Sequence, residues 1–561
     1  MSRGKYAKFT HNFEGVDSIF KDGRTGLFLP DSIRPLAKGY SEAGASHMRR
    51  ALKGFNARSG SPNEDINWHN STLRQRGRML YMSSPVATSA INTNRTKVVG
   101  VGLTLKSAID REILGLTPEE AKEWQRRTER EFSLWAERKA NCDATGMNNL
   151  AGMQQLALVS WLMSGDCFVL FKRGSPSPGN PYSLRLHLIE ADRISTPGQH
   201  YGYAGGTNGP FYSITDGKNQ DTGNRIYDGV EVDASGLAVA YHVRNTYPFQ
   251  YDYQETKWER VEAYGKRTGF PNILHIMSSE RPDQYRGVTY LAQVIEPLLQ
   301  LRRYTESALM MALVQSFFTA WVVTKDDPNR IPWNEAGGGD VAGIPGANPA
   351  DSNISHSENE YEMGPGTINT MAEDEDIKFG NPTMPVAGFD EFIKTFCKLI
   401  GAGLGVPYDV LVKEYNSSYS AARGALMDAW DDFRMRRSWL VDDFCKPTYE
   451  VWLAEAVARG RISAPGFFDD PLIRAAWSGS LWIGPIQASL DPQREVNAAI
   501  LQIQHALKTH EQVTREQGGG DWDANVEQLK GENERLSDAG AVFQPLVPDG
   551  KEKENGEGGT G

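Results

Sequence analysis

Two apolar segments separated by an acidic insertion decide the fold of this chain. The first is VTYLAQVIEPLLQLRRYTESALMMALVQSFF, residues 288–318, and the second is FDEFIKTFCKLI, residues 389–400. Their apolar side chains recur every three or four residues, which predicts two helices. Pro297 interrupts the first segment, and we expect a kink there. Residues 298–318 alone would form a helix about 31 Å long, at about 1.5 Å per residue.

The segment between these two predicted helices is long and acidic. Residues 325–378 hold 12 Asp and Glu against three Lys and Arg, with frequent Gly, Pro and Asn. An unstructured loop of that length is uncommon in a compact domain. We therefore expect residues 326–386 to fold as a small module or against a neighbouring copy of the chain.

Glycine and proline mark the end of the second helix. Residues 401–405 read GAGLG and Pro407 follows, which is typical of a helix stop. Beyond it the pattern predicts a loop over 406–418, a long helix over 419–457 interrupted at Pro447, and one more helix within 490–516. The Gly-, Glu- and Lys-rich residues 538–561 are expected to be disordered.

The region before the helix pair predicts a mixed α+β unit over residues 100–285. Thr117, Pro118 and Glu120 have the spacing of a capped helix start, and residues 150–163 are apolar enough for a buried helix. Helices are also expected over 70–82 and 86–99. Strands are predicted at 167–171, 184–188, 239–243 and 272–277. Residues 198–224 are expected to form a long surface loop.

Composition and charge limit the classes of function that this chain can have. The chain has 561 residues, enough for about three or four structural units. Its 60 Lys and Arg against 71 Asp and Glu give a net charge of −11, so a whole-surface clamp on DNA is not expected. The four cysteines have neither zinc-site nor disulfide-framework spacing, which favours a reducing intracellular setting. We find neither a signal peptide nor an apolar run long enough to span a membrane, and expect a soluble protein.

Signatures of catalysis are missing from the sequence. It contains no P-loop, no Gly-x-Ser-x-Gly and no His-Glu-x-x-His, and its ten histidines lack metal-ligand spacing. Asp431-Asp432 and Asp442-Asp443 are adjacent pairs, which do not share a helix face and are poor acid–base dyads; we expect Asp432 to pair with Arg436. We therefore expect no enzyme activity, no cofactor and no metal.

Several motifs occur in an order that resembles the portal proteins of lambda-like tailed bacteriophages. They are RGRML at 76–80, Pro85, VVGVG at 98–102, GDCF at 165–168, IEADRI at 189–194, RGV at 286–288, Pro365-Gly366, GLGVPY at 403–408 and NSSYSAAR at 416–423. Together they cover about residues 65–460. The positions that we carry over as family motif residues are Arg76, Arg78, Gly100, Gly102, Gly287, Pro407, Tyr419, Ser420 and Arg423.

The resemblance implies an α+β, portal-type multidomain subunit that forms a ring. Its parts would be an N-terminal arm at 1–60, a wing at 61–285, a stem helix at 286–319, a clip insertion at 320–386, a second stem helix at 387–405, a tunnel loop at 406–418, wing and crown helices at 419–516, and a flexible C-terminal tail at 517–561. The tunnel loop would face DNA. Lys413 is the sole Lys or Arg within it, and Asn416 and Ser417 are neutral donors, so we hypothesise that these three residues line the channel.

The resemblance also implies partners and location. The ring, dodecameric in assembled particles, would sit at one capsid vertex and pass double-stranded genome DNA inward during packaging and outward during ejection. It would contact the terminase large subunit, the major capsid or scaffold proteins and head–tail adaptor proteins, but no membrane, and would assemble in the host bacterial cytoplasm.

Two other functions stay open at this point. One is a ring-forming head–tail adaptor or baseplate protein that never threads DNA. The other is a DNA-packaging enzyme, against which the missing P-loop and metal-ligand spacing argue. Lys413 itself has a plainer alternative as an ordinary solvent-exposed lysine.

Overall fold

The computed structural model divides into two units, residues 1–60 and 61–561, and the second contains nearly all of the described structure. The described residues are 50, 54, 59–198, 216–248, 250, 255–316, 320–324, 375–379, 388–414, 419–487, 492–518 and 520–539. The rest of the predicted arm, residues 199–215, most of the clip, Asn416, Ser417 and residues 540–561 lie outside them.

Helices and two sheets build the first half of the second unit. The helical elements are α1 (Pro62–Ser83), α2 (Pro85–Asn94), a π-helix η4 (Arg95–Val99), α3 (Arg111–Leu114), α4 (Pro118–Ala136), α5 (Lys139–Cys142), α6 (Leu150–Ser164) and η5 (Ala191–Arg193). The strands are β1 (Thr104–Ser107), β2 (Asp166–Arg173), β3 (Leu184–Glu190), β4 (Asp216–Lys218), β5 (Arg225–Tyr227), β6 (Val230–Val232), β7 (Ala238–Arg244), β8 (Trp258–Glu262) and β9 (Ile273–Met277). These bounds confirm the helices and strands predicted for this region.

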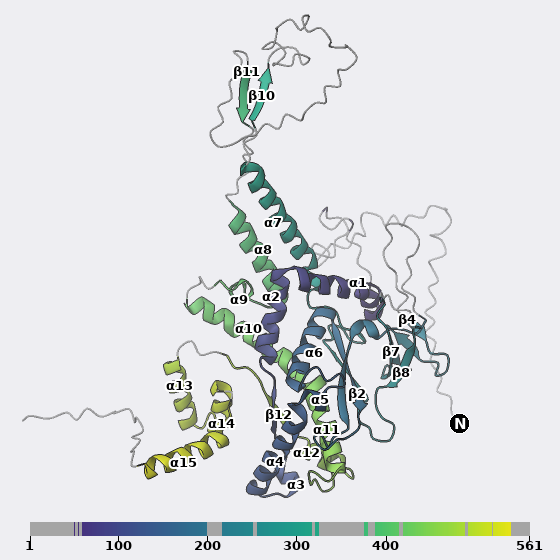
Figure 1. Ribbon diagram of the computed structural model, residues 1–561, viewed down its shortest axis with the longest axis vertical. Coiled ribbons are helices and arrows are strands. Elements are labelled where there is room, and N and C mark those ends of the chain that lie inside the picture. The colour runs from purple at the N-terminus through teal and green to yellow at the C-terminus, as the bar shows by residue number, and fades with distance from the viewer. Residues whose placement is uncertain are drawn as a thin grey trace, which may run out of the picture. The chain divides into compact units, whose positions relative to one another are not determined.

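The second half is mainly helical. It comprises η6 (Ala292–Val294), α7 (Ile295–Ser316), β10 (Ala320–Thr324), β11 (Glu375–Phe379), α8 (Phe389–Leu404), α9 (Tyr408–Val412), α10 (Tyr419–Leu440), a π-helix η9 (Val441–Cys445), α11 (Lys446–Ala458), α12 (Pro471–Trp477), β12 (Ser480–Ile483), α13 (Pro492–Gln504), α14 (His510–Val513), η10 (Thr514–Gly518) and α15 (Trp522–Asp538). Figure 1 shows these elements in the colours of their chain positions.

The helix ends follow local chemistry. The Thr117 side chain accepts the Glu120 N–H, and the Glu120 side chain accepts the Thr117 N–H, so α4 begins with the predicted capping box. In α6 most side chains are buried, because it passes through the core of this half. Figure 1 shows α6 running beside β2.

All sheets are antiparallel. β2 lies between β3 and β9, and β4 to β8 form a five-stranded meander in chain order. A small apolar core that includes Phe168, Ile189 and Tyr241 joins the two sheets. The larger core includes Trp135, Met153 and Trp452 and unites α2, α4 and α6 with α10 and α11.

Five expectations about element boundaries were wrong. The flexible tail expected over 517–561 is not wholly irregular, since it contains the helix α15. Pro297 does not kink a helix, because α7 starts at Ile295 and a proline in the first turn removes no intrahelical hydrogen bond. Residues 406–418 are not wholly loop, since α9 forms within them. The region 490–516 holds α13 and α14 rather than one helix. The predicted surface loop contains β4, which pairs with β5 at the edge of the meander.

The interruption of the third long helix takes a specific form. The backbone widens to the π-helix η9 over Val441–Cys445 and then continues as α11, with Pro447 in its first turn. Pro447 has no backbone N–H, so a carbonyl oxygen one turn earlier lacks its usual hydrogen-bond donor. A π-turn is one way for the helix to accommodate the missing bond.

Candidate functional site

The helices α7 and α8 lie side by side and antiparallel (Figure 1). Val294, which directly precedes α7, packs close to Gly403 near the end of α8: a Cβ on Gly403 would lie 3.1 Å from Val294 Cγ1. Further along, the Tyr304 ring stacks on Phe389 at 5.6 Å and packs on Phe392 at 4.1 Å between ring centres. Residues early in one helix therefore contact residues late in the other. The two predicted apolar segments thus form a helical hairpin.

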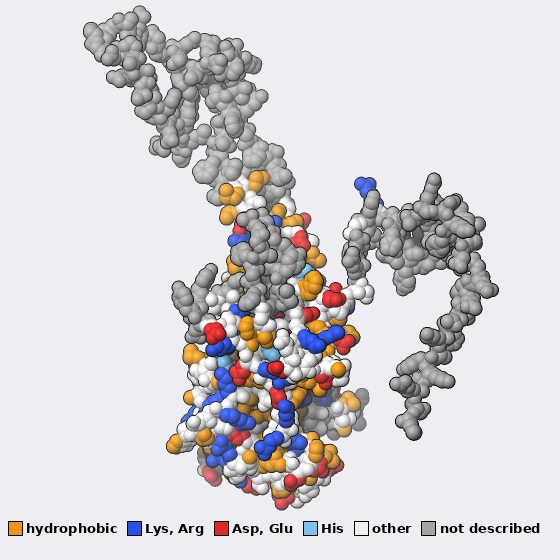
Figure 2. All heavy atoms as spheres, turned by 90° about the vertical axis from the view of Figure 1, so that its right-hand side faces the viewer, with side chains coloured by type: hydrophobic (Ala, Val, Ile, Leu, Met, Phe, Trp, Pro, Cys, Tyr) orange, Lys and Arg blue, Asp and Glu red, His pale blue; other side chains and the backbone are white. Residues whose placement is uncertain are grey.

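The hairpin exposes large apolar side chains on both of its helices. Leu309 is 62% exposed, Met310 60% and Leu399 60%. Figure 2 shows hydrophobic side chains at the surface of the helix pair, next to the atoms drawn in grey. Solvent-exposed leucine and methionine on adjacent helices are typical of surfaces that bind another protein or another copy.

The insertion begins and ends as paired strands. β10 pairs antiparallel with β11, with Ala320 opposite Phe379 and Thr324 opposite Glu375. Residues 325–374 therefore leave and return at one place, as expected for a module carried on the two helices. Whether they fold as a module lies outside the described residues.

The segment after α8 turns sharply into α9. Gly405 has φ +63° and caps the helix in the left-handed conformation that glycine adopts without strain. Pro407 immediately precedes α9, and its carbonyl oxygen accepts the N–H groups of Val410 and Leu411 at 3.1 and 2.9 Å. The Ser89 hydroxyl donates to the Leu411 carbonyl oxygen at 2.7 Å, which fixes α9 against α2.

Lys413 ends α9 with φ +61° and is exposed. Beside it the Tyr408 hydroxyl donates to the Glu414 carboxylate at 2.7 Å. Burial and this hydrogen bond raise the pKa of Tyr408 to about 12. Lys413 is therefore an exposed cation directly after α9, one residue before the described segment ends at Glu414; Asn416 and Ser417 lie beyond the described residues.

α10 anchors the same region to the body of the protein. Tyr419 and Ser420 are its first two residues, and Arg423 on the next turn is half-buried. The expected Asp432–Arg436 pair is present at 3.9 Å. The Arg436 guanidinium also lies over the Tyr290 ring and donates to Asn94 at 3.1 Å, and the Tyr290 hydroxyl donates to the Leu404 carbonyl oxygen. The end of α8, the C-terminal part of α10 and α2 therefore share one polar junction.

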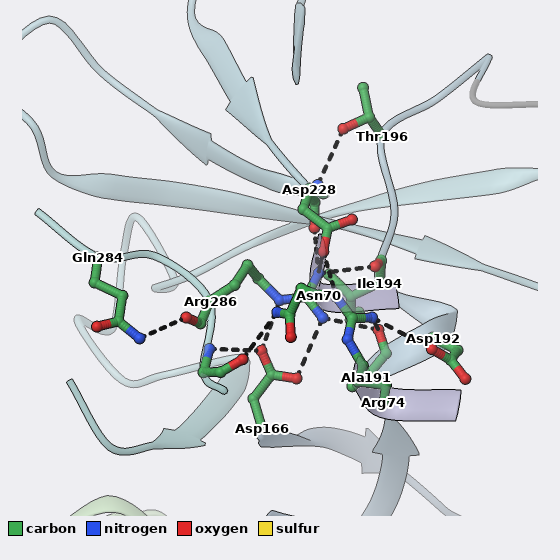
Figure 3. A network of polar contacts seen from close by, with 12 residues as sticks. Asn70, Arg74, Asp166, Ala191, Asp192, Ile194, Thr196, Asp228, Gln284 and Arg286 are labelled. Carbon is green, nitrogen blue, oxygen red and sulfur yellow. Dashed lines mark hydrogen bonds and ion pairs between the residues drawn. The ribbon is translucent and has the colours of Figure 1, made fainter. Parts of the chain in front are cut away.

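A buried charge network holds the segment that leads into α7 (Figure 3). Arg286 Nε lies 2.6 Å from Asp166 Oδ2, and Arg286 Nη1 lies 2.9 Å from Asp228 Oδ2. Arg74 Nη2 lies 2.5 Å from the same Asp228 oxygen and Arg74 Nη1 3.3 Å from Asp192. Burial opposes ionisation of Asp166, but Arg286 outweighs it and holds the pKa of Asp166 far below its usual range. The network joins α1, β2, η5 and the β5–β6 turn to residues 284–287.

Sequence reasoning missed most of this network. Arg286 and Asp166 lie inside motifs that were quoted, but no role was expected for them, and Arg74 and Asp228 carried no signal at all. The paired residues lie between 58 and 154 positions apart, so their ion pairs leave no local spacing by which the sequence could have indicated them.

The remaining motif residues have structural positions. Arg76 is exposed, whereas Arg78 pairs with Asp192 and, at 3.7 Å, with Glu190. Gly287 abuts Gly165, since a Cβ on Gly287 would lie under 3.0 Å from the Gly165 carbonyl oxygen. Gly100 and Gly102 follow η4 with positive φ angles, and side chains there would collide with Pro485 and Ala151.

Nothing in the described ranges resembles a catalytic or metal centre. Among those residues, no group of three or more His, Cys, Asp and Glu is placed to hold a metal ion. The four cysteines are free thiols and buried. No helix of the described part is long and apolar enough to cross a bilayer.

Comparison with known families decides what these features belong to. Residues 48–437 match the family described as phage portal protein, lambda family. The chain belongs to this family. It is therefore a phage portal protein, a structural component of the virion at the head–tail connector.

Relatives along nearly the whole chain agree with this assignment. Portal protein B of Escherichia phage lambda is 23% identical over 91% of this chain and 92% of its own length. The portal protein of Escherichia phage N15 is 23% identical over 95% of this chain and 97% of its own length. The probable portal protein of Halomonas phage phiHAP-1 is 23% identical over 80% of this chain and 77% of its own. Among solved structures, the neck of a native gene transfer agent particle is 14% identical with a TM-score of 0.39, covering 73% of this chain and 93% of that one.

Proposed function

We propose that this portal protein assembles into a closed ring around a channel for double-stranded genome DNA. The observation that carries the proposal is the exposure of large apolar side chains on both helices of the α7–α8 hairpin. The two helices pack on each other within the subunit and leave Leu309 and Met310 of α7 and Leu399 of α8 uncovered, which suits packing against the next copy. Repeated around an axis, that contact closes a ring with the hairpin as its barrel wall.

The charge of the chain suits a conduit. Many Lys and Arg contacts to phosphate would make binding tight and strongly salt-dependent, and would hinder sliding. A net charge of −11 repels a duplex at short range, within about 10 Å at 0.1 M salt. A few mobile cations then suffice to touch the backbone. Lys413, exposed at the end of α9, supports the idea that the tunnel loop supplies one of them, with Asn416 and Ser417 as neutral donors.

The proposed partners follow from this role. The ring is a dodecamer at one capsid vertex, built in the host cytoplasm with the major capsid or scaffold proteins. The terminase large subunit docks on the clip during packaging, and head–tail adaptor proteins dock there later. The ring itself hydrolyses no nucleotide and cuts no DNA. In this assignment residues 61–285 are the wing, 286–319 and 387–405 the stem, 320–386 the clip, 406–418 the tunnel loop and 419–516 the wing and crown helices.

Electron microscopy of the purified full chain tests the ring. We expect closed rings with an axial channel wide enough for a duplex about 20 Å across and with α7 and α8 lining the wall. Phage particles that lack the protein test the conduit. Closed but empty shells are expected, whereas full shells would leave the adaptor function as the better assignment. ATP hydrolysis or DNA cleavage by the pure protein would revive the enzyme alternative.

A variant of Lys413 tests the tunnel loop separately. Lys413→Gln removes the charge and keeps the length, so rings should form while packaging or ejection of DNA changes. A ring structure with the Lys413 side chain pointing away from the axis would contradict the assignment.

A further inference from the structure

A cationic cleft lies between α10 and the C-terminal helical segment. It has a volume of about 490 Å³ and is bordered by Arg434, Arg437, Lys508 and Arg515, with Glu516 as the single carboxylate among the lining residues. The lining thus carries a net charge of +3, whereas the whole chain carries −11. A cluster of positive charge in a chain whose net charge is negative requires an explanation.

Two of these cations lie on one face of α10. Arg434 and Arg437 are three residues apart, a spacing that brings side chains together on a helix and makes like charges unfavourable. Burial and the nearby Arg434 guanidinium lower the pKa of Arg437 to about 10. The structure therefore keeps two guanidinium groups close together at an energetic cost that an anion between them would remove.

Arg437 has no carboxylate partner within the described part of the chain. Its Nε donates to the Val98 carbonyl oxygen at 2.8 Å, and its Nη2 donates to those of Lys97 and Pro485 at 2.8 and 2.7 Å. These three bonds fix the guanidinium in place without neutralising it. Arg437 is thus pre-organised at the wall of the cleft, with its charge uncompensated.

The other cations are only partly neutralised. Arg434 is 63% exposed along its side chain and lies 3.7 Å from Asp431, which is itself 80% exposed. Arg515 pairs with Glu511 at 2.7 Å, and Lys508 pairs with Glu516. The ion pairs at the rim are solvent-exposed and weak, so these side chains remain free to turn toward an anionic ligand.

We propose that this cleft binds a backbone phosphate of DNA. The inference rests on the proposed function, because DNA is the polyanion that such a ring admits. α10 starts directly after the predicted tunnel loop, and Arg434 lies 15 residues further, about 22 Å along the helix at about 1.5 Å per residue. The cleft therefore supplies a second tier of phosphate contacts on the same helix. Guanidinium groups suit this ligand, since their planar fork matches two phosphate oxygens.

The test is DNA binding by assembled rings as a function of salt. Anisotropy of a labelled 30-base-pair duplex would be measured between about 50 and 300 mM salt for the wild type and for Arg434→Gln/Arg515→Gln. We expect about tenfold weaker binding at 100 mM salt and a slope of log affinity against log salt that is smaller by at least about 1. The matched control, Lys257→Gln/Lys266→Gln, loses the same charge at two exposed lysines flanking β8 and should change affinity less than about twofold.

The outcomes separate this inference from the proposed function. Equal losses in both double variants would overturn it, because the effect would then be one of overall charge. Normal DNA binding by cleft variants that still form rings would also overturn it, while leaving the conduit intact. Polyglutamate and unlabelled duplex would also be compared as competitors of the labelled duplex on wild-type rings. If polyglutamate displaces it at the lower concentration of charge, the cleft is assigned to an acidic polypeptide instead. Wild-type rings that bind no DNA would overturn the phosphate site, whereas the conduit is tested separately by the particles that lack the protein.

Discussion

Arg286 and Asp166 form a bidentate ion pair in which both side chains are fully buried, with 2.6 Å from Nε to Oδ2 and 3.2 Å from Nη2 to Oδ1. The pair links the start of β2 to the segment that leads into α7, 120 residues later in the chain. Arg286 also donates to the carbonyl oxygens of Ala191 and Ile194 at 2.9 and 3.0 Å. The root of the hairpin is therefore fixed to the sheet region by charge rather than by apolar packing alone.

Removing one partner of this pair should be costly. Arg286→Met removes the guanidinium from the buried Asp166 carboxylate and leaves beside it the Gly287 N–H at 3.2 Å and His275 at 3.4 Å. We expect a loss of about 3–5 kcal/mol of stability, seen as a large fall in melting temperature. Arg286→Met/Asp166→Leu should recover part of that loss, because no charge then remains unpaired. Arg76→Gln, on the exposed side of α1, is the control and should change stability by less than about 0.5 kcal/mol.

Contact between Gly165 and Gly287 leaves no room for a side chain. A Cβ on Gly287 would lie under 3.0 Å from the Gly165 carbonyl oxygen, and backbone atoms cannot move aside cheaply. Gly287→Ala should therefore destabilise the protein by about 3 kcal/mol.

A second glycine offers the matched comparison for thermal denaturation. A Cβ at Gly424 within α10 would meet nothing within 4 Å, so Gly424→Ala should be neutral or stabilise by about 0.5–1 kcal/mol through helix propensity. Similar effects of the two alanines would contradict the close approach seen between Gly165 and Gly287.

Replacing exposed leucines of the hairpin with serine should impair assembly without impairing folding. Leu309→Ser/Leu399→Ser should shift the protein from rings toward monomers, because fully burying one leucine side chain stabilises an interface by roughly 1.5–3 kcal/mol. The subunit itself should keep its melting temperature. Analytical ultracentrifugation measures the shift, and Leu237→Ser, an equally exposed leucine between β6 and β7, is the control that should leave rings intact.

The carboxyl group of Asp443 should make the stability of the protein depend on pH. Burial and the neighbouring Asp442 raise the pKa of Asp443 to about 6. The folded state then binds this proton more tightly than the unfolded state, whose Asp has a pKa of about 3.9, so the group destabilises the fold progressively as pH rises from about 4 through 6.

Replacing this carboxyl with an amide isolates the effect. Asp443→Asn should raise the melting temperature at pH 8 by roughly 1–3 °C and leave it unchanged near pH 4. Asp431→Asn, at an 80% exposed carboxylate on α10, provides the comparison and should behave alike at both pH values. An equal gain from Asp443→Asn at pH 4 and pH 8 would show that charge is not the cause.

Local patterns were sufficient for most elements of the fold. The capping box at Thr117, the buried helix α6 and the alternating strand β3 depend on neighbours within one or two turns, and all were predicted. Element boundaries were less secure where two local signals compete. Pro297 is a helix breaker in an interior and a good residue in a first turn, and only the position of Ile295 at the start of α7 distinguishes the two.

The site divides in the same way. Lys413 was singled out because it is the one cation of a short segment, and its place in the channel stays a prediction. The Asp432–Arg436 pair was predicted from its helical spacing and is confirmed. The cleft around Arg437 and the Arg74–Asp228–Arg286 network were not found, since their members come from segments far apart in the chain.

The amino-acid order by itself determined the helix pair with its acidic insertion, the α+β character of the region before it and the family to which the chain belongs, because these depend on periodicity and on ordered motifs. Only the tertiary structure decided which charges meet in the interior and which apolar side chains stay uncovered. Ion pairing and burial are set by distances in space, and folding brings together residues whose separation along the chain carries no information about those distances.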